Sequence, residues 1–221
     1  MPSTNILGQY LDSVKIIPYH LLMPDQKYHH GDLKNALIRA GVEILAQEGT
    51  EGLSLRKVAQ RVGVSHNAPY SHFPDKQSLI AAISTEGFYR LYDELDAAIT
   101  SHPDDLKRQL QEGAWAYAQF AIQNTETFKI MFSGVLEKEK DYPAFVEVSQ
   151  KAFSRVVDVV RACQQAGVLR ASAPEVMAVA VWGQIHGIIS LMLEGQISHT
   201  VLDQFELRDI VLFALDQVLI S

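Results

Sequence analysis

The sequence predicts an all-α protein of about nine helices, and three observations support this fold class. Apolar residues recur at the spacing of one helix face almost throughout the 221-residue chain, and no strand-like alternation persists. Capping residues and glycines stand at the ends of the periodic segments, as they do at helix termini. Hydrophobic residues make up 48% of the chain and charged residues 20%, so the chain has enough apolar surface for a packed core.

The first two expected helices have clear end signals. An apolar stripe runs from Asp32 to about Gln47, and Gly49 follows it as a C′ residue. Ser54 is expected to be the N-cap of a short second helix, and the chain turns after it at Gly63. Helical periodicity on both sides of these signals predicts two packed helices.

Two more helices follow this turn. Ser65 is expected to cap a short helix that reaches about His72, and Phe73-Pro74 stops it. Asp75 then caps a long helix over residues 76–99.

The rest of the chain is also expected to be helical, over residues 104–123, 126–132, 142–166, 174–194 and 201–219. Pro174 occupies a first-turn position, where its missing N–H costs little, and Gly167 ends the preceding helix. Residues 176–193 carry no formal charge and approach the length of a membrane span. Polar residues inside this stretch and the absence of flanking basic anchors favour a helix buried in a core or a subunit interface.

Charge and cysteine content narrow the functional classes. The net charge is −7, which by itself argues against a nucleic-acid partner. The charge is uneven, however, because residues 27–76 carry seven basic and five acidic side chains (+2), which leaves −9 for the rest. The single cysteine, Cys163, excludes an intramolecular disulfide and fits a reducing, cytoplasmic location. We expect no signal peptide, metal site or cofactor, and we interpret residues 1–27 as an N-terminal extension.

The segment Ser54–Lys76 carries the functional signal. Two short capped helices that meet at a glycine-containing turn are typical of a helix-turn-helix, in which the second helix enters the major groove of DNA. Small polar side chains gather on and just before this second helix, and such groups bond base edges and phosphates. An ordinary helical hairpin in a bundle explains the periodicity equally well.

A family resemblance favours DNA binding. Residues 28–83 resemble the N-terminal domain of the TetR family of transcriptional regulators, through Ser54–Ala59, Gly63–Ser65 and Tyr70–Lys76. Trp182–Gly187 resembles the WHG-type C-terminal domain of one subgroup, as do Tyr28–Leu33 and Ala68-Pro69-Tyr70. The resemblance implies a helix-turn-helix domain over residues 28–78 and a helical effector-binding and dimerisation domain over residues 79–221.

The resemblance also implies roles for individual residues. The recognition helix would contact DNA through Ser65, His66, Asn67, Ser71 and His72. Sugar-phosphate contacts would come from Ser54, Arg56, Tyr70 and Lys76. The chain departs from the common family pattern at Pro69, which removes the helical hydrogen bond to the Ser65 carbonyl and predicts an irregular or later helix start.

Two further sets of residues follow from the C-terminal half. Aromatic and apolar side chains of this half would line a pocket for an apolar or aromatic effector, and we expect them to be Trp115, Phe120, Phe128, Met131, Phe153, Trp182 and His186. The last two helices would form a homodimer interface, through Val176, Val179, Ala180, Gly183, Gly187, Ile210, Val211, Ala214, Leu215 and Val218. Plain core packing is the alternative for the aromatic residues.

The sequence therefore predicts a ligand-responsive transcriptional regulator, a repressor that binds a palindromic operator as a dimer and is released by a small molecule. The alternatives are a helical enzyme and a ligand-binding protein without operator binding. We do not expect an enzyme, because the chain has no metal-ligand spacing, phosphate loop or nucleophile motif.

Overall fold

The computed structural model describes residues 33–220, which form nine α-helices and two short 3₁₀ helices. The N-terminal elements in chain order are α2 (Leu33–Gly52), α3 (Leu55–Val62), the 3₁₀ helix η2 (Ala68–Ser71) and α4 (Lys76–Thr100). The remaining elements are α5 (Leu106–Gln123), α6 (Thr125–Phe132), η3 (Glu139–Asp141), α7 (Pro143–Gln165), α8 (Pro174–Leu193), α9 (His199–Leu202) and α10 (Leu207–Asp216). The all-α fold is confirmed, while the extension and the Tyr28–Asp32 motif lie outside the described residues.

The predicted end signals act where the sequence indicates. Gly49 takes a positive φ of 66° and interrupts α2, a backbone conformation that glycine adopts without strain. The Ser54 side chain accepts a hydrogen bond from the Lys57 amide and caps α3. Asp75 caps α4 by accepting from the Ser78 amide over 2.8 Å, and the Ser78 hydroxyl accepts from the Asp75 amide in return. These local bonds set where each helix begins.

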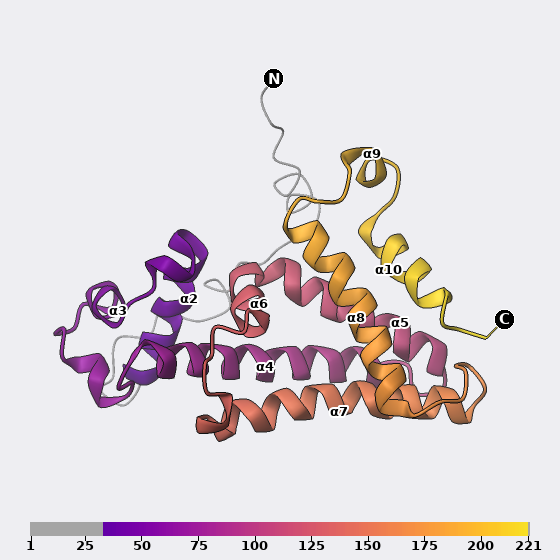
Figure 1. Ribbon diagram of the computed structural model, residues 1–221, viewed down its shortest axis with the longest axis horizontal. Coiled ribbons are helices and arrows are strands. Elements are labelled where there is room, and N and C mark those ends of the chain that lie inside the picture. The colour runs from indigo at the N-terminus through magenta and orange to yellow at the C-terminus, as the bar shows by residue number, and fades with distance from the viewer. Residues whose placement is uncertain (1–32, 221) are drawn as a thin grey trace.

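Helix α4 connects the two ends of the molecule (Figure 1). Its first turns pack against α2, and its length runs beside α5 and α7. Helix α6 contacts both α2 and α4, so it lies between the N-terminal helices and the rest of the bundle. Gly87 of α4 allows this close approach, because a Cβ at that position would meet Met131 and Thr127 of α6 at 2.5 and 3.0 Å.

The C-terminal helix differs from the prediction over 201–219. The chain forms the short α9, breaks, and resumes as the ten-residue α10. Beyond α10 the backbone is extended, because Leu219 forms an antiparallel bridge with Leu169 and the Ile220 amide donates to the Val168 carbonyl over 2.9 Å. A tertiary contact of the backbone therefore ends the last helix early.

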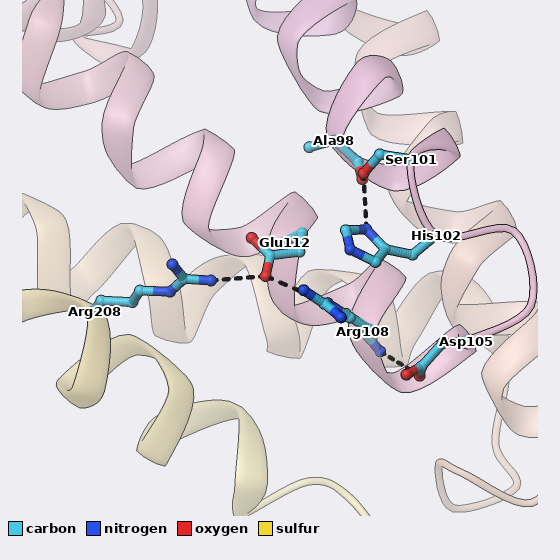
Figure 2. A network of polar contacts seen from close by, with 7 residues as sticks. All are labelled: Ala98, Ser101, His102, Asp105, Arg108, Glu112 and Arg208. Atoms are coloured by element: carbon cyan, nitrogen blue, oxygen red, sulfur yellow. Dashed lines mark hydrogen bonds and ion pairs between the residues drawn. The ribbon is translucent and has the colours of Figure 1, made fainter.

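Helix α10 is fastened to α5 by a charged network (Figure 2). Arg208 of α10 donates to the Glu112 carboxylate of α5 over 2.7 Å. Arg108, one turn earlier on α5, lies 3.9 Å from the same carboxylate. Asp105 caps α5 by accepting from the Arg108 amide over 2.9 Å. This network fixes which face of α10 lies against the bundle.

Among the described residues, α8 is long and apolar enough to cross a membrane by length and composition, with a mean hydropathy of 1.8. It packs against α5, α7 and α10. We therefore interpret it as a helix of the bundle with one exposed face.

Candidate DNA-binding surface and interior cavity

The α3–η2 unit has the form of a helix-turn-helix with a shortened second element. Leu55, Val58 and Ala59 are buried on the inner face of α3. Gly63 ends the helix with φ 76°, and the Val64 amide closes the turn by donating to the Ala59 carbonyl over 3.0 Å. This left-handed glycine reverses the chain direction between the two elements.

The second element corrects the prediction of an α-helix capped by Ser65. Residues Ala68–Ser71 form a four-residue 3₁₀ helix whose N-cap is Asn67. The Ser65 carbonyl accepts from the Ala68 amide over 3.0 Å, in a tight turn. Pro69 is the physical reason, because it has no N–H to donate to the Ser65 carbonyl in an α-helix.

The residues predicted to read DNA are brought together on this short segment. Side chains exposed to solvent are those of Ser65, His66, Asn67, Tyr70, Ser71 and His72. Tyr70 is 56% exposed although it is a large aromatic residue. Phe73, only 2% exposed, anchors the segment from below, and its amide donates to the Pro69 carbonyl over 2.8 Å. The segment therefore presents polar groups outward from a fixed apolar base.

The candidate phosphate ligands differ in whether they already make contacts within the protein. Arg56 is exposed on α3 and makes no ion pair among the described residues. The hydroxyl of Ser54 is half-buried and already caps α3. The Lys76 ammonium donates to the Thr50 carbonyl of α2 over 2.9 Å, so Lys76 also links α4 to α2. A structural role for Lys76 was not foreseen from the sequence.

Two other cations of α3 are engaged within the protein. Lys57 pairs with Glu48 of α2. The Arg61 guanidinium lies 3.1 Å from the Glu43 carboxylate and donates to the Gln47 side chain over 2.8 Å. These pairs hold α3 against α2 and neutralise two positive charges near the candidate surface. Arg56 is therefore the most available cation of α3.

A cavity of about 160 Å³ lies between α4, α5, α6, α7 and α8. Its walls include Phe88, Phe132, Phe153 and Trp182. A second space of about 50 Å³ lies beside it and reaches Leu110 of α5. The two spaces share the side chains of Leu95, Tyr117, Val156 and Trp182 as lining residues.

Tyr117 holds the polar centre of this region. Its hydroxyl accepts a hydrogen bond from Trp182 Nε1 over 3.1 Å and lies 2.7 Å from His186 Nδ1. Burial raises the pKa of the Tyr117 hydroxyl and lowers the pKa of His186, because both groups are desolvated. Both side chains are therefore neutral near pH 7.

The predicted pocket residues fall into two groups. Phe153 and Trp182 line the larger cavity, while Phe128 and His186 belong to the aromatic cluster around it, with ring centroids 5.5 Å apart.

Phe128, His186 and the other three predicted pocket residues line neither space, which corrects that part of the prediction. Trp115 lies under Arg208 of α10 at 5.7 Å, Phe120 is fully buried with Arg90 above its ring, and Met131 packs against Gly87. Each is used in helix packing.

Two further aromatic residues that the sequence offers as pocket candidates, Tyr117 and Phe132, also line the larger cavity. The signal for Tyr117 is its spacing from Leu110 and Gly113, which places the three on one buried face of α5. Partners on α4 and α7 have no comparable signal, because they come from other parts of the chain.

The predicted dimer face is divided by the structure. Exposed on α8 are Val176, Val179, Ala180 and Gly183, and Gly187 is half-buried. On α10, however, Val211, Ala214 and Leu215 are buried within the chain, so they are not available to a partner. Ile210 and Val218 are half-buried. The bonds of Arg208 to α5 turn the Val211 face inward and leave Phe213 68% exposed on the outer face.

Comparison with known proteins identifies the family. The fold and the α3–η2 unit define an all-helical protein with a helix-turn-helix at one end. The family model "Bacterial regulatory proteins, tetR family" matches residues 37–83. The model "Tetracyclin repressor-like, C-terminal domain" matches residues 110–215, a range that includes the Trp182–Gly187 motif. The chain belongs to the TetR family of regulatory proteins.

Individual relatives agree with this family. The chain is 26% identical over 111 residues to the uncharacterized HTH-type transcriptional regulator YobS of Bacillus subtilis (strain 168), covering 50% of this chain and 57% of that protein. It is 42% identical over 50 residues to the class A tetracycline repressor of Escherichia coli, covering 23% of each chain. These alignments thus span less than two thirds of either relative.

One solved structure matches over most of both chains. A protein with unknown function from Rhodococcus sp. RHA1 superposes with a TM-score of 0.75 at 30% identity, over 87% of this chain and 96% of that one. The whole described fold, from the N-terminal helices through the bundle, therefore has a counterpart in that protein.

Proposed function

We propose that the protein is a transcriptional repressor that binds a palindromic DNA operator as a homodimer in the cytoplasm and is released by a small molecule. The observation that carries this proposal is the exposed polar segment of residues 65–72 on an anchored helix-turn-helix. Polar side chains of this kind bond base edges in the major groove, and a fixed base sets their register.

The DNA contacts divide into two kinds. His66, Asn67 and His72 are proposed to read base edges, because they are exposed on the turn before η2 and at its C-terminal end. Tyr70 and Arg56 are proposed to hold phosphates, since both extend from the same end of the molecule into solvent. Phosphate contacts position the protein, and base contacts give it specificity.

The dimer is proposed to form through the exposed faces of α8 and α10. Val176 and Val179 of α8 are 66% and 52% exposed, which is unusual for valine, and Phe213 lies on the outer face of α10. Two copies joined there would direct two α3–η2 units at successive major grooves, about 34–36 Å apart. This arrangement accounts for both the apolar surface and the need for a palindromic site.

Fluorescence anisotropy with DNA from upstream of the protein's own gene, at low salt, tests the proposal. We expect binding to that DNA to be tighter than to a random duplex. Replacing His72 or Asn67 with Ala should remove the preference while retaining weak binding. Replacing Tyr70 with Phe should weaken the binding of both DNAs equally, because phosphates carry no sequence information.

Absence of any preference for upstream DNA would contradict the repressor proposal. It would favour the alternative of a ligand-binding protein without an operator. Binding of both DNAs that is unchanged in the His72 and Tyr70 variants would show that the α3–η2 surface does not contact DNA.

A further inference from the structure

The size of the larger cavity limits what it can hold. Its volume is about 160 Å³, and the neighbouring space adds about 50 Å³. An apolar protein cavity of about 150 Å³ accommodates one benzene molecule. The cavity between α4 and α8 therefore matches a single six-membered ring with small substituents.

The walls provide faces and edges for an aromatic guest. Phe132 and Phe153 approach the Trp182 ring with centroid separations of 5.9 and 6.1 Å. Phe88 packs on Phe132 edge-to-face at 5.4 Å. Rings at such separations favour tilted and edge-to-face contacts with another ring.

The polar atoms of the cavity are almost fully used by the protein itself. Because burial keeps His186 neutral, its Nδ1 can accept the Tyr117 proton, and Trp182 Nε1 already donates to the same hydroxyl. The Ser149 hydroxyl donates to the Val146 carbonyl over 3.0 Å. One acceptor position on the Tyr117 oxygen is left, and no lining side chain carries a charge.

The lining of the cavity discriminates between ligands by their charge. A carboxylate in the cavity would find no cation among the lining side chains, and an unpaired buried charge costs far more than apolar contacts return. A hydroxyl could donate to the remaining lone pair of Tyr117, and a hydrocarbon ring needs no partner. We propose that the effector is an uncharged single-ring aromatic compound, benzene-like or phenol-like, and that its carboxylate analogues are excluded. This inference rests on the proposed function and specifies its effector.

Direct binding tests the inference with toluene, phenol and benzoate as probes at pH 7, because phenol and benzoate are similar in size but differ in charge. The protein has two tryptophans, so Trp115→Phe leaves Trp182, which lines the cavity, as the reporter. We expect toluene and phenol to change Trp182 fluorescence and to raise Tm, and benzoate to do neither. Equal binding of benzoate, or no binding of either neutral ring, would overturn the proposal.

Filling the cavity provides the matched test. Ala152 of α7 lines the larger cavity, and Ala114 of α5 lines the smaller space alone. Ala152→Leu should weaken phenol binding at least tenfold, while Ala114→Val should leave it within twofold. If Ala152→Leu does not fold by circular dichroism, Ser149→Leu, which fills the same cavity, replaces it. Unchanged phenol affinity in the filled variant would contradict the site.

Release of upstream DNA by phenol is the measurement that separates this inference from the proposed function. These binding measurements contain no DNA, so their failure leaves operator binding as a separate result. Phenol that binds but does not release upstream DNA would overturn its role as effector, even though operator binding itself is observed.

Discussion

Gln77 joins the start of α4 to the loop after α6. Its Nε2 donates to the Val135 carbonyl over 3.1 Å, and its Oε1 accepts from the Glu137 amide over 3.3 Å. Gln77 is the second residue of α4, directly after Lys76, while Phe132 at the end of α6 lines the cavity. The amide of one side chain thus connects the loop after α6, which follows the cavity-lining Phe132, to the start of α4, the helix that directly follows the α3–η2 unit.

Replacing Gln77 with Leu should loosen this connection. Loss of these two hydrogen bonds, one partly buried and one exposed, is expected to lower the free energy of unfolding by roughly 1–2 kcal/mol. Amide hydrogen exchange at Glu137 should accelerate. Gln77→Glu keeps the acceptor for Glu137 but loses the donor to Val135, so it should retain more of the Glu137 protection. Equal Glu137 exchange rates in wild type and Gln77→Leu would refute the connection.

Arg56 is expected to dominate the electrostatic part of DNA binding by α3. Arg56→Ala should reduce the slope of log affinity against log salt by about 1, because one phosphate contact is lost. Lys57→Ala is the matched control on the same helix, and its slope should hardly change, since Glu48 already neutralises Lys57. Salt titrations of random duplex DNA measure both slopes, and equal slopes in the two variants would argue against Arg56 as a phosphate ligand.

Gly187→Leu is expected to break the dimer without harming the subunit. A Cβ at Gly187 would meet no atom within 4 Å, so the side chain has room in the monomer. In the proposed interface the same side chain would collide with the partner helix. Sedimentation velocity should show a monomer, and thermal unfolding should show a folded chain. A folded variant of unchanged dimeric mass would exclude this face of α8.

Stability should depend on pH through His186. Burial holds the pKa of His186 in the folded state below its usual value, so the unfolded chain binds the proton more readily. The resulting stability is fully present above about pH 6.5, the ordinary histidine pKa, and declines as the pH falls toward the folded-state pKa. His186→Gln, which can still accept from Tyr117, should flatten this part of the urea-denaturation profile. An unaltered profile would mean that other groups control it.

Cys163 is expected to be unreactive in the folded protein. Its side chain is fully buried on α7, and burial raises the pKa of the thiol to about 11. Because the thiolate is the reactive form, a thiol reagent at pH 8 should modify Cys163 at the rate of unfolding. Rapid modification under native conditions would show that this part of α7 opens locally.

Local signals allowed much of the fold to be predicted. Ser54 and Asp75 cap helices because their side chains reach amides three residues later, an interaction encoded within four residues of sequence. Pro69 likewise indicated an irregular recognition element, and the result is a 3₁₀ helix. The extent of α10 could not be predicted in this way, because it ends where Leu219 pairs with Leu169, fifty residues away.

In the candidate sites, too, some features could be predicted from local sequence and others depend on how the helices pack. Exposure of the polar side chains between Ser65 and His72 follows from their polarity, and the sequence indicated them as a group. Trp115 and Trp182 have similar apolar surroundings in sequence, yet one lies beneath Arg208 and the other lines the cavity. Only the packing of α10 against α5 distinguishes them.

Local patterns in the chain were enough to predict the all-α class, the caps and turns of the N-terminal helices, and the resemblance to TetR regulators. Periodicity and capping act over a few residues, so they can be read directly from the chain. Tertiary structure alone decided which aromatic residues face the cavity and which face of α10 remains exposed. It also decided that Tyr117 meets His186 across 69 residues of sequence, because such contacts depend on how separate helices pack.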